Sequence, residues 1–260
     1  MKNILAIFGR DFKSYFYSPI AYVVLTIFVL LAGLFYSNIF TAIVESAMMQ
    51  GMRSQQYGQP AQPIDVPGMV ARNFFGTLSV ILLFMIPMIT MGLFSEERKR
   101  GTIELLLTVP LTNIQVVLGK FFAGLTFFCC MLGLSFLLMG TLFYFSTPSL
   151  GPIFSGYLGL LLYGASLVAL GMFVSTLTEN QIIAAVLGFG MILVLWIVDA
   201  FAGSTGTVMQ QIVSYLSVIQ HLEDFIKGVV DTPGVIFYIS LTVFGILLTY
   251  RSVESYRWRG

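Results

Sequence analysis

Six long apolar runs, separated by shorter polar segments, dominate the pattern of hydrophobic and polar positions along the chain. They cover approximately residues 20–40, 73–94, 114–145, 153–176, 181–203 and 234–251. Because roughly 20 apolar residues in a helix cross the hydrocarbon core of a bilayer, each run is long enough to span a membrane. The pattern therefore predicts an all-α membrane protein with six transmembrane helices in a single domain over residues 1–260.

The first 18 residues have a different period from the spans. Their apolar side chains recur at spacings of three and four residues (Leu5, Phe8, Phe12, Phe16), with Arg10 and Lys13 on the other side. This spacing predicts an amphipathic helix that lies in the membrane interface and ends at Ser18-Pro19. The alternative is a frayed terminus. No cleavable signal peptide is expected, because the basic residues are spread along this segment.

The segments between the spans carry several local signals. Thr112–Gln115 and Thr178–Gln181 both match a capping box before an apolar run, and Pro87 predicts a kink in the second span. Residues 41–72, rich in Gln, Gly and Pro, are interpreted as an extended or partly ordered loop. Residues 204–233 are half apolar and predict helical pieces that re-enter the outer leaflet before the sixth span.

Composition supports the bilayer as solvent, and the placement of charge predicts the orientation. The chain is 57% hydrophobic and 10% charged, against about 25% charged in soluble domains. With the N-terminus inside, ten basic residues fall on the inner side and three on the outer side. The inner ones are Lys2, Arg10, Lys13, Arg98, Lys99, Arg100, Lys120, Arg251, Arg257 and Arg259; the outer ones are Arg53, Arg72 and Lys227. The bias predicts that both termini are cytoplasmic.

The residues that could carry chemistry are few. Cys129 and Cys130 are adjacent within an apolar run and favour buried thiols over a disulfide. His221 is the only histidine. There is no phosphate-binding loop of the Walker type, because Gly119-Lys120 is followed by phenylalanine. We therefore expect no catalytic site, no bound cofactor and no metal site. Small residues four apart, such as Ala165 with Ala169, Gly171 with Ser175 and Ala184 with Gly188, either allow close helix packing or line a path.

The densest cluster of charge, Ser95–Thr112, lies between the second and third spans. Gly101 and Pro110 bracket eight residues, enough for a two-turn helix of about 12 Å. Ile103, Leu106 and Leu107 can form one apolar face on it, which would suit a groove on a cytosolic partner. The alternative is a solvated loop whose basic residues only set the topology.

The same stretch resembles the coupling-helix region of ABC-2 type permeases, and it is most similar to the gliding-motility-associated group. The matching residues are Ser-Glu-Glu-Arg-Lys-Arg-Gly-Thr-Ile-Glu-Leu-Leu-Leu-Thr-Val-Pro-Leu-Thr at 95–112 and Val-Leu-Gly-Lys at 117–120. The N-terminal helix then resembles the family's elbow helix. The resemblance implies docking on an ATPase through Glu96, Glu97, Arg98, Gly101, Thr102, Ile103, Glu104, Leu106, Leu107 and Pro110. A second, weaker inner contact is implied at Thr178, Glu179, Asn180 and Gln181.

These features and the resemblance predict the permease subunit of an ATP-driven exporter in the bacterial inner membrane. ATP and Mg²⁺ would bind to a separate ATPase dimer. The resemblance implies a second permease subunit, either identical or a different one with a large periplasmic domain, as is frequent in the gliding-associated group. No nucleic acid is expected as a partner. The alternative is a subunit that transmits motion to a periplasmic partner without substrate flux. A secondary carrier or channel is disfavoured, because the spans lack ionisable residues near mid-membrane.

Overall fold

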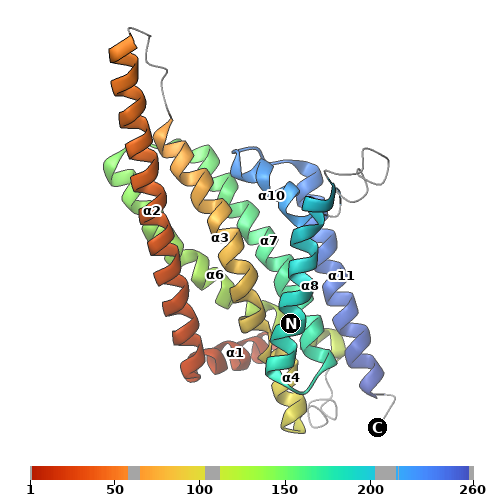
Figure 1. The fold of residues 1–260 in the computed structure, drawn as a ribbon. Helices are drawn as coiled ribbons and strands as arrows, with labels where there is room; N and C mark the ends of the chain where they lie inside the picture. Colours follow the sequence, from red (N-terminus) through yellow and green to blue (C-terminus); the bar gives the residue numbers. More distant parts are fainter. Residues whose placement is uncertain (1, 58–64, 103–111, 203–214, 216, 258–260) are drawn as a thin grey trace.

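Helices make up nearly all of the described chain in the computed structural model (Figure 1). The structure describes residues 2–57, 65–102, 112–202, 215 and 217–257. The helices are α1 (Lys2–Tyr17), α2 (Pro19–Tyr57), α3 (Val66–Thr90), α4 (Gly92–Lys99), α6 (Asn113–Phe145), α7 (Leu150–Leu177), α8 (Gln181–Ala202), α10 (Val218–Ile226) and α11 (Thr232–Arg257). These helices confirm the predicted fold class at the level of an all-helical chain.

Six of the helical segments are long and apolar enough to cross a membrane, which confirms the number of spans. They are α2, α3 continued by α4, α6, α7, α8 and α11. In its most apolar window α7 is 78% buried inside the molecule, whereas α8 is 17% buried and α2 and α11 are 22% buried. The helix α7 is therefore the centre of the bundle, and α2, α8 and α11 turn apolar side chains outward, as helices facing lipid do.

Small residues let the neighbours of α7 approach closely. A Cβ atom added at Gly171 would lie 2.3 Å from Oγ1 of Thr90 in α3. One added at Gly245 in α11 would lie 2.9 Å from the backbone of Ala169. Real Cβ contacts are longer than these distances, so both helix pairs can pack this closely only because glycine has no side chain. These contacts favour the packing interpretation of the small residues on α7.

The helix α2 corrects the expectation for the segment after the first span. Residues 41–57, interpreted from the sequence as loop, continue α2 without a break to Tyr57. A helix of 39 residues is about 58 Å long, well beyond a hydrocarbon core of about 30 Å. The upper part of α2 consequently projects from the bundle (Figure 1). Residues 66–72 of the predicted loop form the first turns of α3, and residues 58–64 lie outside the described residues.

The two predicted helix starts had different outcomes. Before α6, the Gln115 side chain accepts a hydrogen bond from the Thr112 amide at 3.4 Å, as the capping box requires. Before α8, the predicted box at Thr178 is wrong. The Asn180 side chain accepts a hydrogen bond from the Ile182 amide at 2.9 Å, so Asn180 caps the helix instead.

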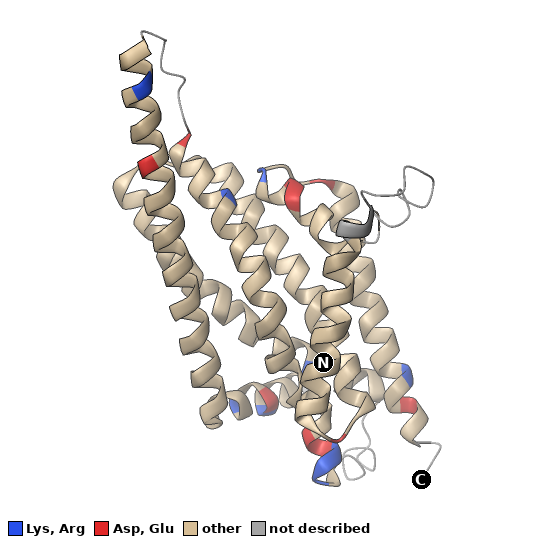
Figure 2. Ribbon diagram, in the orientation of Figure 1, with Lys and Arg blue, Asp and Glu red and all other residues tan. Residues whose placement is uncertain are grey.

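The described charges gather at the two ends of the bundle (Figure 2). At one end, here named the α1 end, α1 lies across the bases of the long helices together with α4 and the end of α11 (Figure 1). At the other, the α10 end, α10 packs against α7 (Figure 1). The depth of α10 in a bilayer stays a prediction, and residues 203–214 and 216 of the same segment lie outside the described chain.

Candidate functional site

The break between α3 and α4 sets the direction of the charged segment. The hydroxyl oxygen of Ser175, from α7, accepts hydrogen bonds from the amides of Phe94 at 3.0 Å and Ser95 at 3.1 Å. The same hydroxyl donates to the carbonyl of Met91 at 2.9 Å. A side chain inserted into the helical ladder is a recognised cause of a kink. The break lies four residues beyond Pro87, whose carbonyl still accepts a hydrogen bond from the Met91 amide. The hydrogen bonds of Ser175 attach the beginning of α4 to α7.

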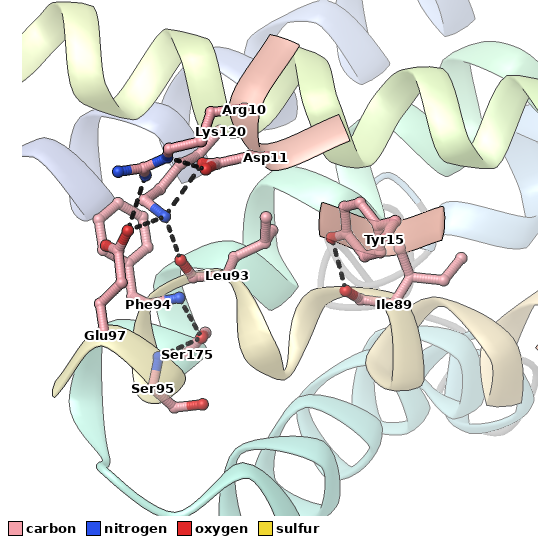
Figure 3. A network of polar contacts seen from close by, with 10 residues as sticks. All are labelled: Arg10, Asp11, Tyr15, Ile89, Leu93, Phe94, Ser95, Glu97, Lys120 and Ser175. Atoms are coloured by element: carbon pink, nitrogen blue, oxygen red, sulfur yellow. Dashed lines mark hydrogen bonds and ion pairs between the residues drawn. The ribbon is translucent and has the colours of Figure 1, made fainter. Parts of the chain in front are cut away.

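A cluster of four charged side chains joins α1, α4 and α6 (Figure 3). Glu97 of α4 pairs with Arg10 of α1 at 2.8 Å and with Lys120 of α6 at 3.0 Å. Lys120 also lies 3.2 Å from Asp11 and donates to the carbonyl of Leu93 at 2.6 Å. The charges balance, with two acids and two bases. We call these residues, Arg10, Asp11, Glu97 and Lys120, the junction cluster.

Burial makes the junction cluster sensitive to the loss of Lys120, Asp11 or Glu97, whereas the Arg10 side chain is 52% exposed. The Lys120 side chain is only 3% exposed, and its ammonium lies 5.0 Å from the centre of the Phe94 ring. Burial lowers the pKa of Arg10, but its contacts with Asp11 and Glu97 outweigh this and raise the pKa above its usual value. Removing one partner from a buried ion pair typically costs about 3–5 kcal/mol, because the other charge stays behind. The cluster therefore holds three helices in one arrangement.

Tyr15 gives α1 a second attachment. Its hydroxyl donates to the carbonyl of Ile89 in α3 at 2.8 Å, and its ring stacks on Phe127 of α6 at 4.9 Å between centroids (Figure 3 shows the hydrogen bond). Burial and the nearby carboxylates of Asp11 and Glu96 raise the pKa of this phenol well above its usual value, so it remains a hydrogen-bond donor. The amphipathic helix is thus fastened to the bundle as well as suited to the interface.

Arg98 connects α4 to the ends of α7 and α11. Its guanidinium donates to the carbonyl of Thr176 at 2.7 Å and pairs with Glu179 at 3.2 Å. It also lies over the ring of Tyr256, 4.6 Å from the centroid. The Tyr256 hydroxyl donates to the same Thr176 carbonyl at 2.8 Å. One arginine thereby brings together α4, the loop after α7 and the last helix.

On its opposite face, α4 carries charged side chains that are more exposed. Arg100 pairs with Glu96 one turn earlier, and their side chains are 69% and 41% exposed. Lys99 is exposed as well. The chain then turns at Gly101, whose φ of +66° is a conformation that favours glycine. Glu96 and Glu97 point in different directions on α4, because Glu96 pairs with the exposed Arg100 and Glu97 joins the junction cluster.

The described chain reaches only part of the predicted coupling site. Glu96, Glu97, Arg98, Gly101 and Thr102 lie on α4 and its turn. The remaining predicted residues, Ile103, Glu104, Leu106, Leu107 and Pro110, lie outside the described residues. In the second predicted contact, Glu179 and Asn180 are exposed, while Thr178 and Gln181 are half-buried. Arg98 joins the two predicted contacts through its pair with Glu179.

Sequence reasoning missed the residues that attach α4 to the bundle. Arg10 was interpreted as a topology signal on the polar side of the first helix, Lys120 as a topology signal and part of the family resemblance, and Ser175 as a small packing or path residue. Asp11 and Tyr256 were given no role. Lys120 offered one usable signal, because a lysine within an apolar run needs an acidic partner. The assembled site holds no arrangement of groups for bond chemistry among the described residues. Its contacts attach α4 to the neighbouring helices.

Comparison with known proteins gives this arrangement a context. The profile of a family described as ABC-2 family transporter protein matches residues 5–249. A protein of Escherichia coli strain K12 described as a probable multidrug ABC transporter permease, YbhS, is 27% identical over 146 residues. That match covers 52% of this chain and 38% of the relative. The protein of the same name from Escherichia coli O157:H7 matches to the same extent. This chain therefore aligns with well under half of the length of either curated relative.

Proposed function

The chain belongs to the ABC-2 family of transporter proteins, and from this membership we propose that it is the permease subunit of an exporter driven by a separate ATPase. Membership of the family implies a lipid bilayer and an ATPase subunit as partners. In our proposal the α1 end faces the cytosol, in line with the ten-to-three bias of basic residues. The ATPase docks on the segment 95–112, with the loop 178–181 as a second contact.

The attachment of α4 on several sides carries this proposal. The junction cluster ties α4 to α1 and α6, Ser175 ties its start to α7, and Arg98 ties its end to α7 and α11. A force applied beyond Gly101 would therefore move several helices together, since packed elements shift as rigid bodies. The exposed Glu96, Lys99 and Arg100 leave a charged face for the partner.

The transport cycle follows from that connection. Closure of the ATPase dimer would move α4 and the helices attached to it in two permease subunits. A path between the two subunits would then open alternately to either side of the membrane. The second permease subunit is a copy of this chain or a related chain. The probable multidrug role in the name of the curated relatives suggests apolar small molecules as one substrate class to test.

A specific observation favours a second candidate function, in which ATP hydrolysis moves an external partner without flux. The upper part of α2 extends past the length needed to span, to Tyr57. It carries Met48, Met49 and Met52, which are at least 60% exposed. An exposed, methionine-rich helix suits an adaptable protein contact. This reading also accommodates the predicted likeness to the gliding-associated group, in which a second subunit bears a large external domain.

Copurification with an ABC ATPase subunit from the same organism tests the docking proposal. We expect Glu96→Arg and Leu106→Asp each to weaken the retention of the ATPase, because the first reverses a charge on the exposed face and the second places a charge on the predicted apolar face. The matched control is Lys227→Glu at the α10 end, which should retain it fully. Full retention in both test variants would refute docking at this segment.

Reconstitution of the complex in liposomes separates the two candidate functions. Stimulation of ATP hydrolysis by a transported compound, together with its accumulation, supports the exporter. Stimulation that depends on an external partner protein, with no flux of any tested compound, supports motion transfer instead.

A further inference from the structure

A cavity of about 700 Å³ opens beside the junction cluster, between α1, the start of α2, the end of α3 and α4. Its volume falls within the range of roughly 300–1,000 Å³ that is typical of ligand sites. Figure 3 shows part of its wall, including Arg10, Tyr15, Ile89 and Glu97. Transmission of motion through α4 does not require such a space, so the cavity needs a separate explanation.

The lining of the cavity divides into an apolar and a charged part. The start of α2 contributes Ile20, Ala21 and Val24, and the end of α3 contributes Met88 and Ile89. The charged part comes from α1 and α4 and includes Arg10, Glu96 and Arg100. Ile20 is 50% exposed on the outer side of α2, so the apolar part reaches the surface that we expect to face lipid. A ligand that fills both parts is an amphiphile.

The exposure of the charged groups indicates the sign of the ligand's head. The carboxylates of Asp11 and Glu97 are engaged in the junction cluster, and their side chains are 12% and 18% exposed. The guanidinium groups are far more accessible, with 52% exposure for Arg10 and 69% for Arg100. Arg10 and Arg100 are therefore the most exposed charged groups of the lining, ahead of Glu96, whose side chain is 41% exposed and pairs with Arg100. Arginine presents a planar fork of donors that matches phosphate oxygens.

We infer that this cavity binds a lipid of net negative charge, whose phosphate lies between Arg10 and Arg100 and whose first acyl carbons lie against α2 and α3. The lipid comes from the leaflet at the α1 end, where α1 lies across the base of the bundle. Such a lipid would contact α1, α3 and α4 at once and would favour the arrangement that the junction cluster holds. This inference does not depend on ATPase docking or on the identity of any exported compound.

Free phosphate is the competing source of the same chemistry, and the cavity distinguishes the two. A soluble phosphate would use only the arginines and would leave the apolar part empty. The lipid uses both parts, so its binding should respond to changes in either. Two independent substitutions follow, one in each part.

Arg100→Gln removes a charge from the head site and keeps a polar side chain. Its matched control is Arg251→Gln, because Arg251 forms a comparable exposed pair with Glu254 on α11, away from the cavity. Gly92→Leu instead fills space, because a Cβ at Gly92 would meet only ordinary contacts at 3.7 Å with Gln181 and Glu96, which also line the cavity. Its control is Gly76→Leu, where a Cβ would meet nothing within 4 Å.

Native mass spectrometry of the full chain, released from detergent micelles with added lipid, measures the binding. The probes are dioleoylphosphatidylglycerol, dioleoylphosphatidylcholine and inorganic phosphate. We expect retention of the glycerol lipid in preference to the choline lipid, and apparent affinity weaker by about tenfold or more in Arg100→Gln, the size expected for a lost charge-assisted hydrogen bond. Gly92→Leu should lose binding to a similar extent, and both controls should bind as the unchanged chain does.

Three outcomes would overturn the inference. Equal retention of the two lipids would remove the requirement for net negative charge. Binding unaffected by Arg100→Gln or by Gly92→Leu would place the lipid elsewhere on the protein. Displacement of the glycerol lipid by millimolar inorganic phosphate would assign the arginines to a soluble anion.

Discussion

The two ends of the bundle are held together by different interactions. At the α1 end, α4 is joined to its neighbours by ion pairs and hydrogen bonds through Glu97, Arg98 and Ser175. At the α10 end, Phe225 is fully buried against Gly159 of α7, and the hydroxyls of Ser155 and Tyr238 donate buried hydrogen bonds to carbonyls of α10. Packed interfaces resist small displacements, whereas a few ion pairs can be exchanged when a partner supplies new ones. Under the proposed function, this difference would let motion enter at the α1 end while α10 stays packed against α7.

The largest expected effect tests the ion pairs at the α1 end. Lys120→Met removes the shared base and leaves Asp11 and Glu97 with only Arg10 as a basic partner in the cluster. We expect a loss of about 3 kcal/mol in the free energy of unfolding, at the lower end for a broken buried pair because Arg10 remains. Denaturant unfolding of the full chain in micelles, followed by tryptophan fluorescence, measures it.

The exposed Lys227 provides the matched lysine at the other end. Lys227→Met removes a surface pair with Glu223 and should leave the unfolding midpoint unchanged. If Lys120→Met also leaves the unfolding midpoint unchanged, the junction cluster does not hold the helices together, and the proposed difference between the two ends is wrong.

The next effect tests the packed end. A Cβ atom at Gly159 would lie 2.5 Å from Cβ of Phe225, so Gly159→Ala must push α10 away from α7. The expected cost is about 1–3 kcal/mol, the usual range for overpacking. Gly140→Ala on α6 is the control, because nothing lies within 4 Å of its added Cβ. The same unfolding measurement should show destabilisation at Gly159 and none at Gly140; equal effects would mean that α10 is not closely packed.

A third prediction sharpens the role of hydrogen bonds at the α1 end. Ser175→Ala removes the acceptor for the amides of Phe94 and Ser95, and we expect a loss of about 1–2 kcal/mol because these groups are buried. Ser166→Ala on the same helix is the control, since its buried hydroxyl bonds only to the carbonyl of Tyr163 one turn earlier. Hydrogen exchange of the Phe94 and Ser95 amides should accelerate only in the first variant.

The long helices were predictable, because the length of an apolar run is a local property of the sequence. The extension of α2 to Tyr57 was missed for a local reason as well. Pro60 and Pro63 and the glutamines suggested a loop, although residues 41–57 contain no proline and several good helix formers. In this case the proline signal was applied to positions that precede it.

The junction cluster was not predictable in the same way. Asp11, Glu97 and Lys120 are far apart in the sequence, and their proximity depends on how α1 crosses the base of α4 and α6. The count of basic residues placed Arg10 and Lys120 on one side, and the structure has both at the α1 end, but the count indicates no pairing with the acids. The cap of α8 shows the same limit at short range. Thr178 and Asn180 are both suitable N-cap residues, and the position at which the helix begins determines that Asn180 is the cap.

The smallest expected effect distinguishes the exposed ion pair on α4 from the buried contacts that attach α4 to the bundle. The pair between Arg100 and Glu96 is exposed and spans one helical turn, so Arg100→Gln should cost only about 0.3–0.5 kcal/mol. A variant that unfolds like the unchanged chain but loses the anionic lipid would assign Arg100 to the cavity and not to the fold. If its unfolding free energy instead fell by as much as that of Lys120→Met, Arg100 would belong to the ionic joint, and the exposed face proposed for the partner would not be free.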